Sequence, residues 1–220
     1  MFNKSVVCLV LISFTCMACE AGLLGGLSMP PDLAFLFHDE GNQTIGALYN
    51  YNASDSTFRS LGRFPSQGFF PGMPRHTSAS AYVLTGNDEE YVTTFFKNKA
   101  VYFSNGTNGA LVRSVFNVSM LFTNGPWRVD AAFSRLNGDR QVIGTSFILR
   151  RWLYECGGFG SSCLKSYIGQ FAQFSNRFHR NGRVLAALGL SDGKVALFKR
   201  SLYAIVHEKG EQAEERPMLA

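Results

Sequence analysis

The sequence lacks the short motifs that mark several enzyme classes. It contains no Gly-x-Ser-x-Gly nucleophile elbow, no phosphate-binding loop and no dinucleotide-binding fingerprint. The glycine-rich stretch 158–162 has neither the lysine nor the following helix that phosphate binding needs. Only four histidines are present, and no two of them have a spacing typical of metal ligands. These absences argue against phosphoryl transfer, nucleotide-dependent redox chemistry and a catalytic zinc site.

Charged residues are also sparse, at 17% of the 220 residues, whereas hydrophobic residues reach 46%. This composition supplies a core and argues against disorder. Adjacent acids occur at Asp39 and Glu40 and again at 88–90, both in predicted turns, where solvated loop charge is the better interpretation. A glycosidase needs two carboxylates facing each other across a cleft, which sequence spacing does not show.

Long apolar runs are absent too. The apolar run at 6–14 is about half of the ~20 residues that a membrane span needs. Lys4 precedes this run and the small residues Ala18 and Ala21 follow it, so residues 1–21 are predicted to be a signal peptide cleaved after either alanine. The alternative is an uncleaved N-terminal anchor. No other segment is apolar enough to cross a membrane.

Cysteine is scarce, and three of the five cysteines lie within the predicted leader. The last of these, Cys19, survives as an odd thiol only if cleavage follows Ala18. Cys156 and Cys163 bracket the glycine-rich stretch and are predicted to form a disulfide in an oxidising compartment. Because the loop is short, the bond is expected to fix local shape more than global stability.

Four N-glycosylation acceptor sequences lie downstream of the leader, at Asn42, Asn52, Asn105 and Asn117. One such match is weak, but four behind a signal peptide form a coherent set, because glycans need exposed sites in a secreted chain. The sequence therefore predicts a secreted, extracellular glycoprotein.

The net charge of +5 is unevenly distributed. Residues 128–200 carry 12 basic and 4 acidic side chains, whereas residues 22–127 carry 6 and 7, together with all four glycosylation signals. An unglycosylated basic half predicts a binding face for an anionic partner. The alternative is that these arginines are ordinary solvated surface. The candidate partner-binding residues are Arg150, Arg151, Arg177, Arg180 and Arg183.

Internal repetition is the most informative feature of the chain. Helical periodicity is scarce, and four segments each pass from a small-residue strand through a polar turn into aromatic strands, marked by Ala34, Ala81, Ala132 and Ala187. A period of roughly fifty residues is typical of a propeller blade, with small residues on crowded inner strands and aromatic residues between blades. A β-sandwich or a lipocalin-like barrel is the alternative, because hairpins look alike in all three folds.

The third repeat resembles hemopexin-type repeats, through RVDAAF at 128–133, Asn-Gly at 137–138 and RRW at 150–152. The fourth repeat resembles them less well, through Ala186, Ala187 and the DGKV turn at 192–195. The resemblance extends over about residues 30 to 206 and implies one all-β, four-bladed β-propeller. It also implies extracellular binding of proteins or matrix components rather than catalysis, and haem binding where two propellers act together.

The same resemblance implies an ion in the central channel, held by carbonyls at the start of each inner strand. Carried over to this sequence, those positions are Asp32, Ala79, Asp130 and Leu185, of which Asp32 and Asp130 keep an acidic residue and become the candidate metal site. The disulfide that commonly joins the first and last blades of the family has no counterpart here. Closure is therefore expected to rest on strand pairing and packing.

The sequence as a whole predicts a single all-β domain at 22–206, followed by a flexible polar tail at 207–220. The first functional hypothesis is a non-enzymatic extracellular binding module for an anionic protein or glycan. The second is a carrier of a small hydrophobic or haem-like ligand, and the third is a secreted hydrolase. Neither a nucleic-acid partner nor a membrane span is expected.

Overall fold

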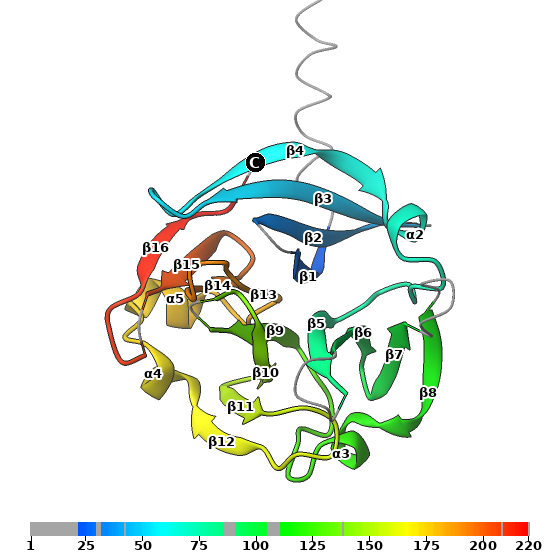
Figure 1. The fold of residues 1–220 in the computed structure, drawn as a ribbon. Coiled ribbons are helices and arrows are strands. Elements are labelled where there is room, and N and C mark those ends of the chain that lie inside the picture. Colours follow the sequence, from blue (N-terminus) through cyan, green and yellow to red (C-terminus); the bar gives the residue numbers. More distant parts are fainter. Residues whose placement is uncertain are drawn as a thin grey trace, which may run out of the picture.

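The computed structural model describes residues 22–29, 32–41, 43–85, 91–104, 111–137, 139–207 and 209–219. In these residues the chain forms four antiparallel sheets of four strands each, arranged around a central axis as a four-bladed β-propeller (Figure 1). The predicted fold is confirmed, and the sandwich and barrel alternatives are excluded. The predicted leader at 1–21 and the acceptors Asn42 and Asn105 lie outside the described residues.

Each blade is a meander of four consecutive strands. Blade 1 contains β1 (Gly22–Met29), β2 (Leu33–Glu40), β3 (Gln43–Asn52) and β4 (Thr57–Pro65). Blade 2 contains β5 (Ala79–Leu84), β6 (Tyr91–Lys97), β7 (Ala100–Ser104) and β8 (Leu111–Asn117). Blade 3 contains β9 (Ala131–Leu136), β10 (Val142–Leu149), β11 (Trp152–Cys156) and β12 (Leu164–Tyr167). Blade 4 contains β13 (Ala186–Gly189), β14 (Val195–Phe198), β15 (Leu202–Val206) and β16 (Glu214–Pro217).

Four short helices lie between the blades. They are α2 (Ser66–Phe69) after blade 1, α3 (Val118–Leu121) after blade 2, and α4 (Ile168–Phe171) with α5 (Asn176–Arg180) after blade 3. Among the described residues, none of the helices has the length and hydropathy of a membrane span.

The first strand of every blade lies at the centre of the ring, where β1, β5, β9 and β13 contact one another (Figure 1). Glycine, alanine and serine make up 13 of the 24 residues of these strands, as the repeat pattern predicted for β5, β9 and β13. A Cβ atom at Gly189 would lie 1.9 Å from the carbonyl oxygen of Ser134, and one at Gly25 would lie 3.3 Å from the backbone of Ala79. The four backbones can approach this closely only because the side chains between them are small.

The inner strands run in one direction, so the propeller has two different faces. Gly25 lies against Ala79, and one residue further along both strands the hydroxyl of Ser80 donates to the carbonyl of Gly26 at 2.7 Å. We name the face where the inner strands begin the entry face; it is marked by Gly22, Ala79, Ala131 and Ala186. The exit face, where they end, is marked by Met29, Leu84, Leu136 and Gly189.

Aromatic side chains fill the spaces between neighbouring blades. Between blades 1 and 2, the ring of Phe95 lies 5.0 Å from that of Phe70 and 5.7 Å from that of Phe37. Between blades 1 and 4, the ring of Phe58 lies 5.8 Å from that of Phe198. Each fully buried phenylalanine stabilises the fold by about 2–3 kcal/mol. The aromatic excess of the sequence therefore holds the blades together.

Blade 4 closes onto blade 1 through polar side chains as well as aromatic packing. The guanidinium of Arg216 donates to the carbonyls of Ser56 at 2.8 Å and Asp55 at 3.0 Å. The ammonium of Lys194 donates to the hydroxyl of Ser56 at 3.0 Å. Hydrogen bonds from Arg216 lower the pKa of Glu214, which keeps this carboxylate ionised beside the guanidinium. These contacts join the first and last blades, which the hemopexin-type family commonly joins by a disulfide.

The C-terminal segment 207–220 was predicted to be a flexible polar tail, and the structure corrects this. Its residues Glu214–Pro217 form β16, the outermost strand of blade 4, which pairs with β15 along its whole length. An edge strand faces solvent and tolerates charged residues, so its sequence has the same composition as a tail. The domain therefore extends beyond residue 206.

The first repeat is shifted by one strand from its predicted position. The segment that begins at Asp32 was expected to be the inner strand, but it opens β2, and β1 is the inner strand instead. The strand β1 consists mainly of glycine and leucine directly after the predicted leader, so it lacks the alternating pattern that marks a strand.

The predicted disulfide between Cys156 and Cys163 is present and shapes a loop that joins blade 3 to blade 2. In this loop the amide of Phe159 donates to the carbonyl of Leu84, at the end of β5, at 2.9 Å. The amide of Gly160 donates to the last residue of α3 at 2.7 Å. The bond therefore fixes a contact between two blades.

We expect Gly189→Ala to lower the free energy of unfolding by about 2–3 kcal/mol, because the new Cβ overlaps the carbonyl of Ser134 and pushes β13 away from β9. Gly68→Ala is the matched control, since no atom lies within 4 Å of a Cβ there. Urea denaturation of both variants measures the difference. Equal stabilities would contradict the close approach of the inner strands.

Candidate functional site

The two candidate metal ligands lie at opposite ends of the channel. Asp130 precedes β9 on the entry face, whereas Asp32 follows β1 on the exit face, as a result of the shift in the first repeat. Asp32 accepts a hydrogen bond from the hydroxyl of Ser191, and Asp130 is paired with arginine. No group of three or more His, Cys, Asp or Glu residues able to hold a metal occurs within the described ranges. The structure therefore does not bring Asp32 and Asp130 together.

Asp130 instead organises three arginines on the entry face. Its side chain is only 4% exposed. One carboxylate oxygen accepts from the guanidinium of Arg128 at 2.9 Å and lies 3.6 Å from the guanidinium of Arg183. The other oxygen accepts from the backbone amide of Arg150 at 2.9 Å. Two of the five predicted partner-binding arginines thus contact one buried carboxylate, Arg183 through its guanidinium and Arg150 through its backbone amide.

Arg150 adopts a backbone conformation that glycine usually provides. It is the first of two residues in the turn between β10 and β11, with φ of 58°. The same turn position holds Gly41 in blade 1 and Asn98 in blade 2, at φ of 67° and 56°. Arginine in this region costs about 1–2 kcal/mol relative to a residue without the steric conflict. A position that disfavours arginine yet holds it points to a role for the side chain.

The remaining predicted arginines also belong to the entry face. Arg151 is the second residue of the same turn, and Arg177 and Arg180 lie on α5, which precedes β13. The C-terminal end of α5 is held by Lys199, whose ammonium donates to the carbonyls of Phe178 and Gly182, each at 2.6 Å.

Lys199 illustrates why a count of basic residues overstates the binding surface. Its side chain lies in the interior, where the residue is 5% exposed, and burial lowers the pKa of its ammonium group. Its two hydrogen bonds satisfy carbonyls at the end of a short helix. Lys199 therefore stabilises the fold and is not available to a partner.

Two exposed tryptophans on the entry face were not among the predicted site residues. Trp127 and Trp152 are 50% and 38% exposed. The ammonium of Lys99 and the guanidinium carbon of Arg128 lie 5.5 and 5.3 Å from the ring centroid of Trp127, and the ammonium of Lys165 lies 4.3 Å from that of Trp152. Each ring is within cation–π distance of a positive charge. The available signal was the position of each tryptophan directly beside an arginine in the chain.

The entry face carries a strong excess of positive charge. Its basic residues come from the turns and connections of blades 2 to 4 and from the connection after blade 1: Arg75, Lys97, Lys99, Arg128, Arg150, Arg151, Arg177, Arg180, Arg183 and Arg200. Two acidic residues, Asp39 and Glu40, also lie on this face, where they pair with His76 and Arg63. The predicted basic face is therefore larger than the sequence segment that suggested it.

Two glycosylation acceptors fall within the described residues, and both are exposed. Asn52 ends β3 on the exit face, where its side-chain oxygen accepts from the hydroxyl of Ser54 at 2.8 Å. Asn117 ends β8 at the outer edge of blade 2, on the entry-face side, where it pairs with Ala100 next to Lys99. The basic face therefore includes an acceptor, unlike the half of the sequence that suggested it. Both positions are accessible to a glycan.

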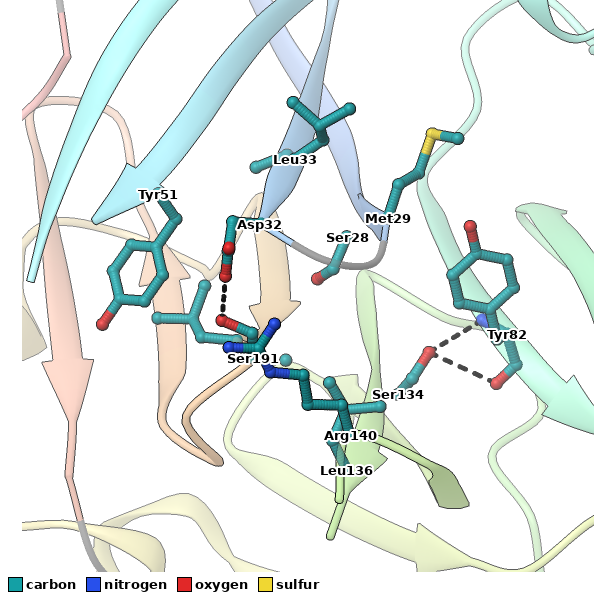
Figure 2. Close-up of a pocket in the computed structure, with 13 residues that line it drawn as sticks. Ser28, Met29, Asp32, Leu33, Tyr51, Tyr82, Ser134, Leu136, Arg140 and Ser191 are labelled. Atoms are coloured by element: carbon teal, nitrogen blue, oxygen red, sulfur yellow. Dashed lines mark hydrogen bonds between the residues drawn. The ribbon is translucent and has the colours of Figure 1, made fainter. Parts of the chain in front are cut away.

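A pocket opens on the exit face at the end of the channel (Figure 2). Its free interior measures only about 20 Å³, room for about one water molecule. Its lining combines the apolar residues Met29, Leu33, Ala34, Leu136 and Leu190 with the polar residues Ser28, Asp32, Tyr51, Tyr82, Ser134, Arg140 and Ser191. A wider polar groove adjoins the pocket and shares Asp32, Tyr51 and Arg140 with it.

Comparison with known proteins supports the fold and no closer relationship. No protein-family profile and no curated protein matches the chain. A seed albumin from Lathyrus sativus is similar in structure, with a TM-score of 0.62 and 14% identity over 90% of this chain and 92% of the albumin. A plant lectin with two metal binding sites from Cicer arietinum has a TM-score of 0.60 and 11% identity over 90% and 91%. At these identities the similarity shows the fold alone.

We expect Asp130→Asn to lower the free energy of unfolding by about 2 kcal/mol, because it removes the charge that holds Arg128 and Arg183 together. Asp139→Asn, in an exposed turn of the same blade, is the control and should change stability by less than about 0.5 kcal/mol. Thermal unfolding of the two variants measures the difference. A neutral Asp130→Asn would show that the carboxylate does not organise the arginines.

Proposed function

We propose that the protein is a secreted, N-glycosylated and non-enzymatic binding module that engages an anionic partner through its entry face. The observation that carries the proposal is Arg150, kept at a turn position where blade 1 has glycine and blade 2 has asparagine. The buried carboxylate of Asp130 fixes neighbouring arginines beside that turn, so less side-chain entropy is lost when a partner binds. The leader pattern and the disulfide support secretion.

Of the two partner classes, an anionic glycan fits the entry face better than an anionic protein. Arginine forms two parallel hydrogen bonds with a sulfate or carboxylate group. The exposed rings of Trp127 and Trp152 add apolar surfaces on which the C–H groups of a sugar ring pack, since an aromatic face carries partial negative charge. A lectin among the structurally similar proteins accords with this proposal.

The other functional hypotheses receive less support from the described residues. A two-carboxylate hydrolase needs a facing pair of acids, and the exit-face pocket is lined by one, Asp32. A carrier of a haem-sized ligand needs a larger apolar cavity than the small exit-face pocket offers. The resemblance to hemopexin-type repeats accords with the fold and stays a prediction at the level of the family.

We expect Arg150→Gly to leave stability unchanged or raise it by up to about 1 kcal/mol, because glycine relieves the left-handed backbone. The same variant should elute from an immobilised sulfated polysaccharide at lower salt, with about 3–10-fold weaker affinity, because one guanidinium is lost. Arg59→Gln, which removes the same charge from the exposed edge strand of blade 1, is the matched control. A destabilised Arg150→Gly with unchanged retention would refute the proposal.

We expect Trp127→Ala to weaken binding of a sulfated decasaccharide by about 3–10-fold and to leave binding of inorganic polyphosphate unchanged. The first probe offers sugar rings to the exposed indole, whereas the second offers charge alone. Calorimetric titration of both probes measures the contrast. Equal losses for the two probes would argue against a glycan partner and for a ring-independent polyanion site.

A further inference from the structure

The polar groove on the exit face has a predicted glycosylation acceptor in its wall. Its free volume is about 520 Å³, within the roughly 300–1,000 Å³ typical of sites for small ligands. Blade 1 contributes Asp32, Asn50, Asn52 and Ser54 to the lining, and the β9–β10 turn of blade 3 contributes Arg140. The acceptor Asn52 and the serine of its acceptor sequence therefore border a space large enough for a sugar.

The side-chain amide of Asn52 is held in one orientation. Its Oδ1 accepts from the backbone amide of Ser54 at 3.1 Å and from the hydroxyl of Ser54 at 2.8 Å. A backbone N–H only donates, so the atom that it contacts is the oxygen, and Nδ2 has no partner among the described residues. Nδ2 is the atom that carries an N-glycan: it displaces the diphosphate from C1 of the first sugar of a lipid-linked oligosaccharide and loses one proton. Attachment therefore leaves both hydrogen bonds of Oδ1 in place.

The turn that follows Asn52 is fixed by blade 4. The ammonium of Lys194 donates to the carbonyl of Ala53 at 3.4 Å, and the guanidinium of Arg216 donates to the carbonyl of Asp55 at 3.0 Å. A sugar joined to a fixed turn loses less conformational entropy when it settles on a neighbouring surface.

The backbone at Arg140, on the opposite wall of the groove, repeats a turn of blade 4 that uses glycine. In blade 3 the amide of Arg140 donates to the carbonyl of Asn137 at 3.0 Å, and in blade 4 the amide of Gly193 donates to the carbonyl of Leu190 at 3.0 Å. The φ angles at the two positions are 64° and 82°. Glycine adopts this conformation freely, whereas arginine there costs about 1–2 kcal/mol. The fold alone would favour glycine, so the arginine indicates a use for its guanidinium.

The groove offers both donors and acceptors that are not used within the fold. Figure 2 shows the Arg140 side chain extending toward Ser191, whose hydroxyl bonds to one oxygen of Asp32. Within the described part of the chain, neither the guanidinium of Arg140 nor the side-chain amide of Asn50 forms a hydrogen bond. The second carboxylate oxygen of Asp32 remains as an acceptor.

We propose that this groove holds the first sugars of the protein's own N-glycan at Asn52, so that the glycan covers the exit end of the channel. This rests on the N-glycosylation proposed above and adds the surface on which the glycan lies. N-acetylglucosamine carries hydroxyls and an acetamide, so Arg140 and Asn50 donate to its oxygens and Asp32 accepts from a hydroxyl. With the exit end covered, a partner reaches the propeller axis only from the entry face.

Release of the glycan from the native secreted protein by peptide N-glycosidase tests the proposal, because the enzyme needs access to the bond between Nδ2 and the first sugar. Each release converts asparagine to aspartate, so peptide masses report occupancy and release at Asn52 separately from the other acceptors. We expect Asn52 to be occupied, and its glycan to leave the native protein at least about tenfold more slowly than the heat-unfolded protein.

Arg140→Gly separates binding in the groove from general steric hindrance. Glycine suits the turn, so the variant should keep its fold, and release from the native protein should become at least about threefold faster because the guanidinium no longer holds the sugar. Asp139→Asn, in the same turn but outside the groove lining, is the matched control and should leave the rate unchanged. Release should also lower the melting temperature of the unmodified sequence by about 2–4 °C, and that of Arg140→Gly by less than about 1 °C.

Three results would overturn the proposal: an unoccupied Asn52, equal release rates from the unmodified sequence and Arg140→Gly, or equal losses of melting temperature in the two. Retention on the immobilised sulfated polysaccharide depends on the entry face and reports on the proposed function separately. An occupied Asn52 with equal release rates would therefore reject the glycan position and leave the entry-face function standing.

Discussion

Four inner strands pack so closely around the axis that a Cβ atom at Gly189 would lie 1.9 Å from the carbonyl of Ser134. This steric limit accounts for much of the remaining architecture. Small residues at the axis supply little apolar surface, so the aromatic side chains between the blades supply most of it, as Phe95 and Phe147 do. Long polar side chains do not fit at the axis, and the candidate binding residues lie instead in the turns at the two faces.

The sequence predicts the parts of this fold that depend on composition within a strand. Alanine-rich segments followed by polar turns identify β5, β9 and β13, because the axis tolerates only small side chains. The first inner strand, β1, was missed because Gly and Leu next to a leader have no strand periodicity. The outer strand β16 was missed because its charged residues are equally suited to a solvated edge and to a tail. Local patterns do not report which sheet a segment joins.

The candidate sites divide in a similar way. The arginine-rich half of the sequence indicates a basic face, and the structure gathers Arg150 and Arg183 at Asp130. What the sequence does not contain is the sign of φ at Arg150 and Arg140, which becomes visible only by comparison with the same turns in other blades. Likewise, from the sequence alone Trp127 would be expected in the core, whereas in the structure it is half exposed and lies near Lys99 and Arg128. Because the four blades share one fold, the residue at a turn position in one blade can be compared with the residues at the same position in the others.

The four seams between blades differ in how they are held. The polypeptide itself crosses three of them, and a covalently closed loop reinforces the one between blades 2 and 3. Across the fourth seam, between blades 4 and 1, no backbone passes within the described part of the chain, and Arg216 and Lys194 bridge it together with aromatic contacts. Tension applied to the two ends of the chain therefore loads these side chains first. In mechanical terms the ring is closed at this seam by side-chain contacts, and these contacts set the force at which the ring opens.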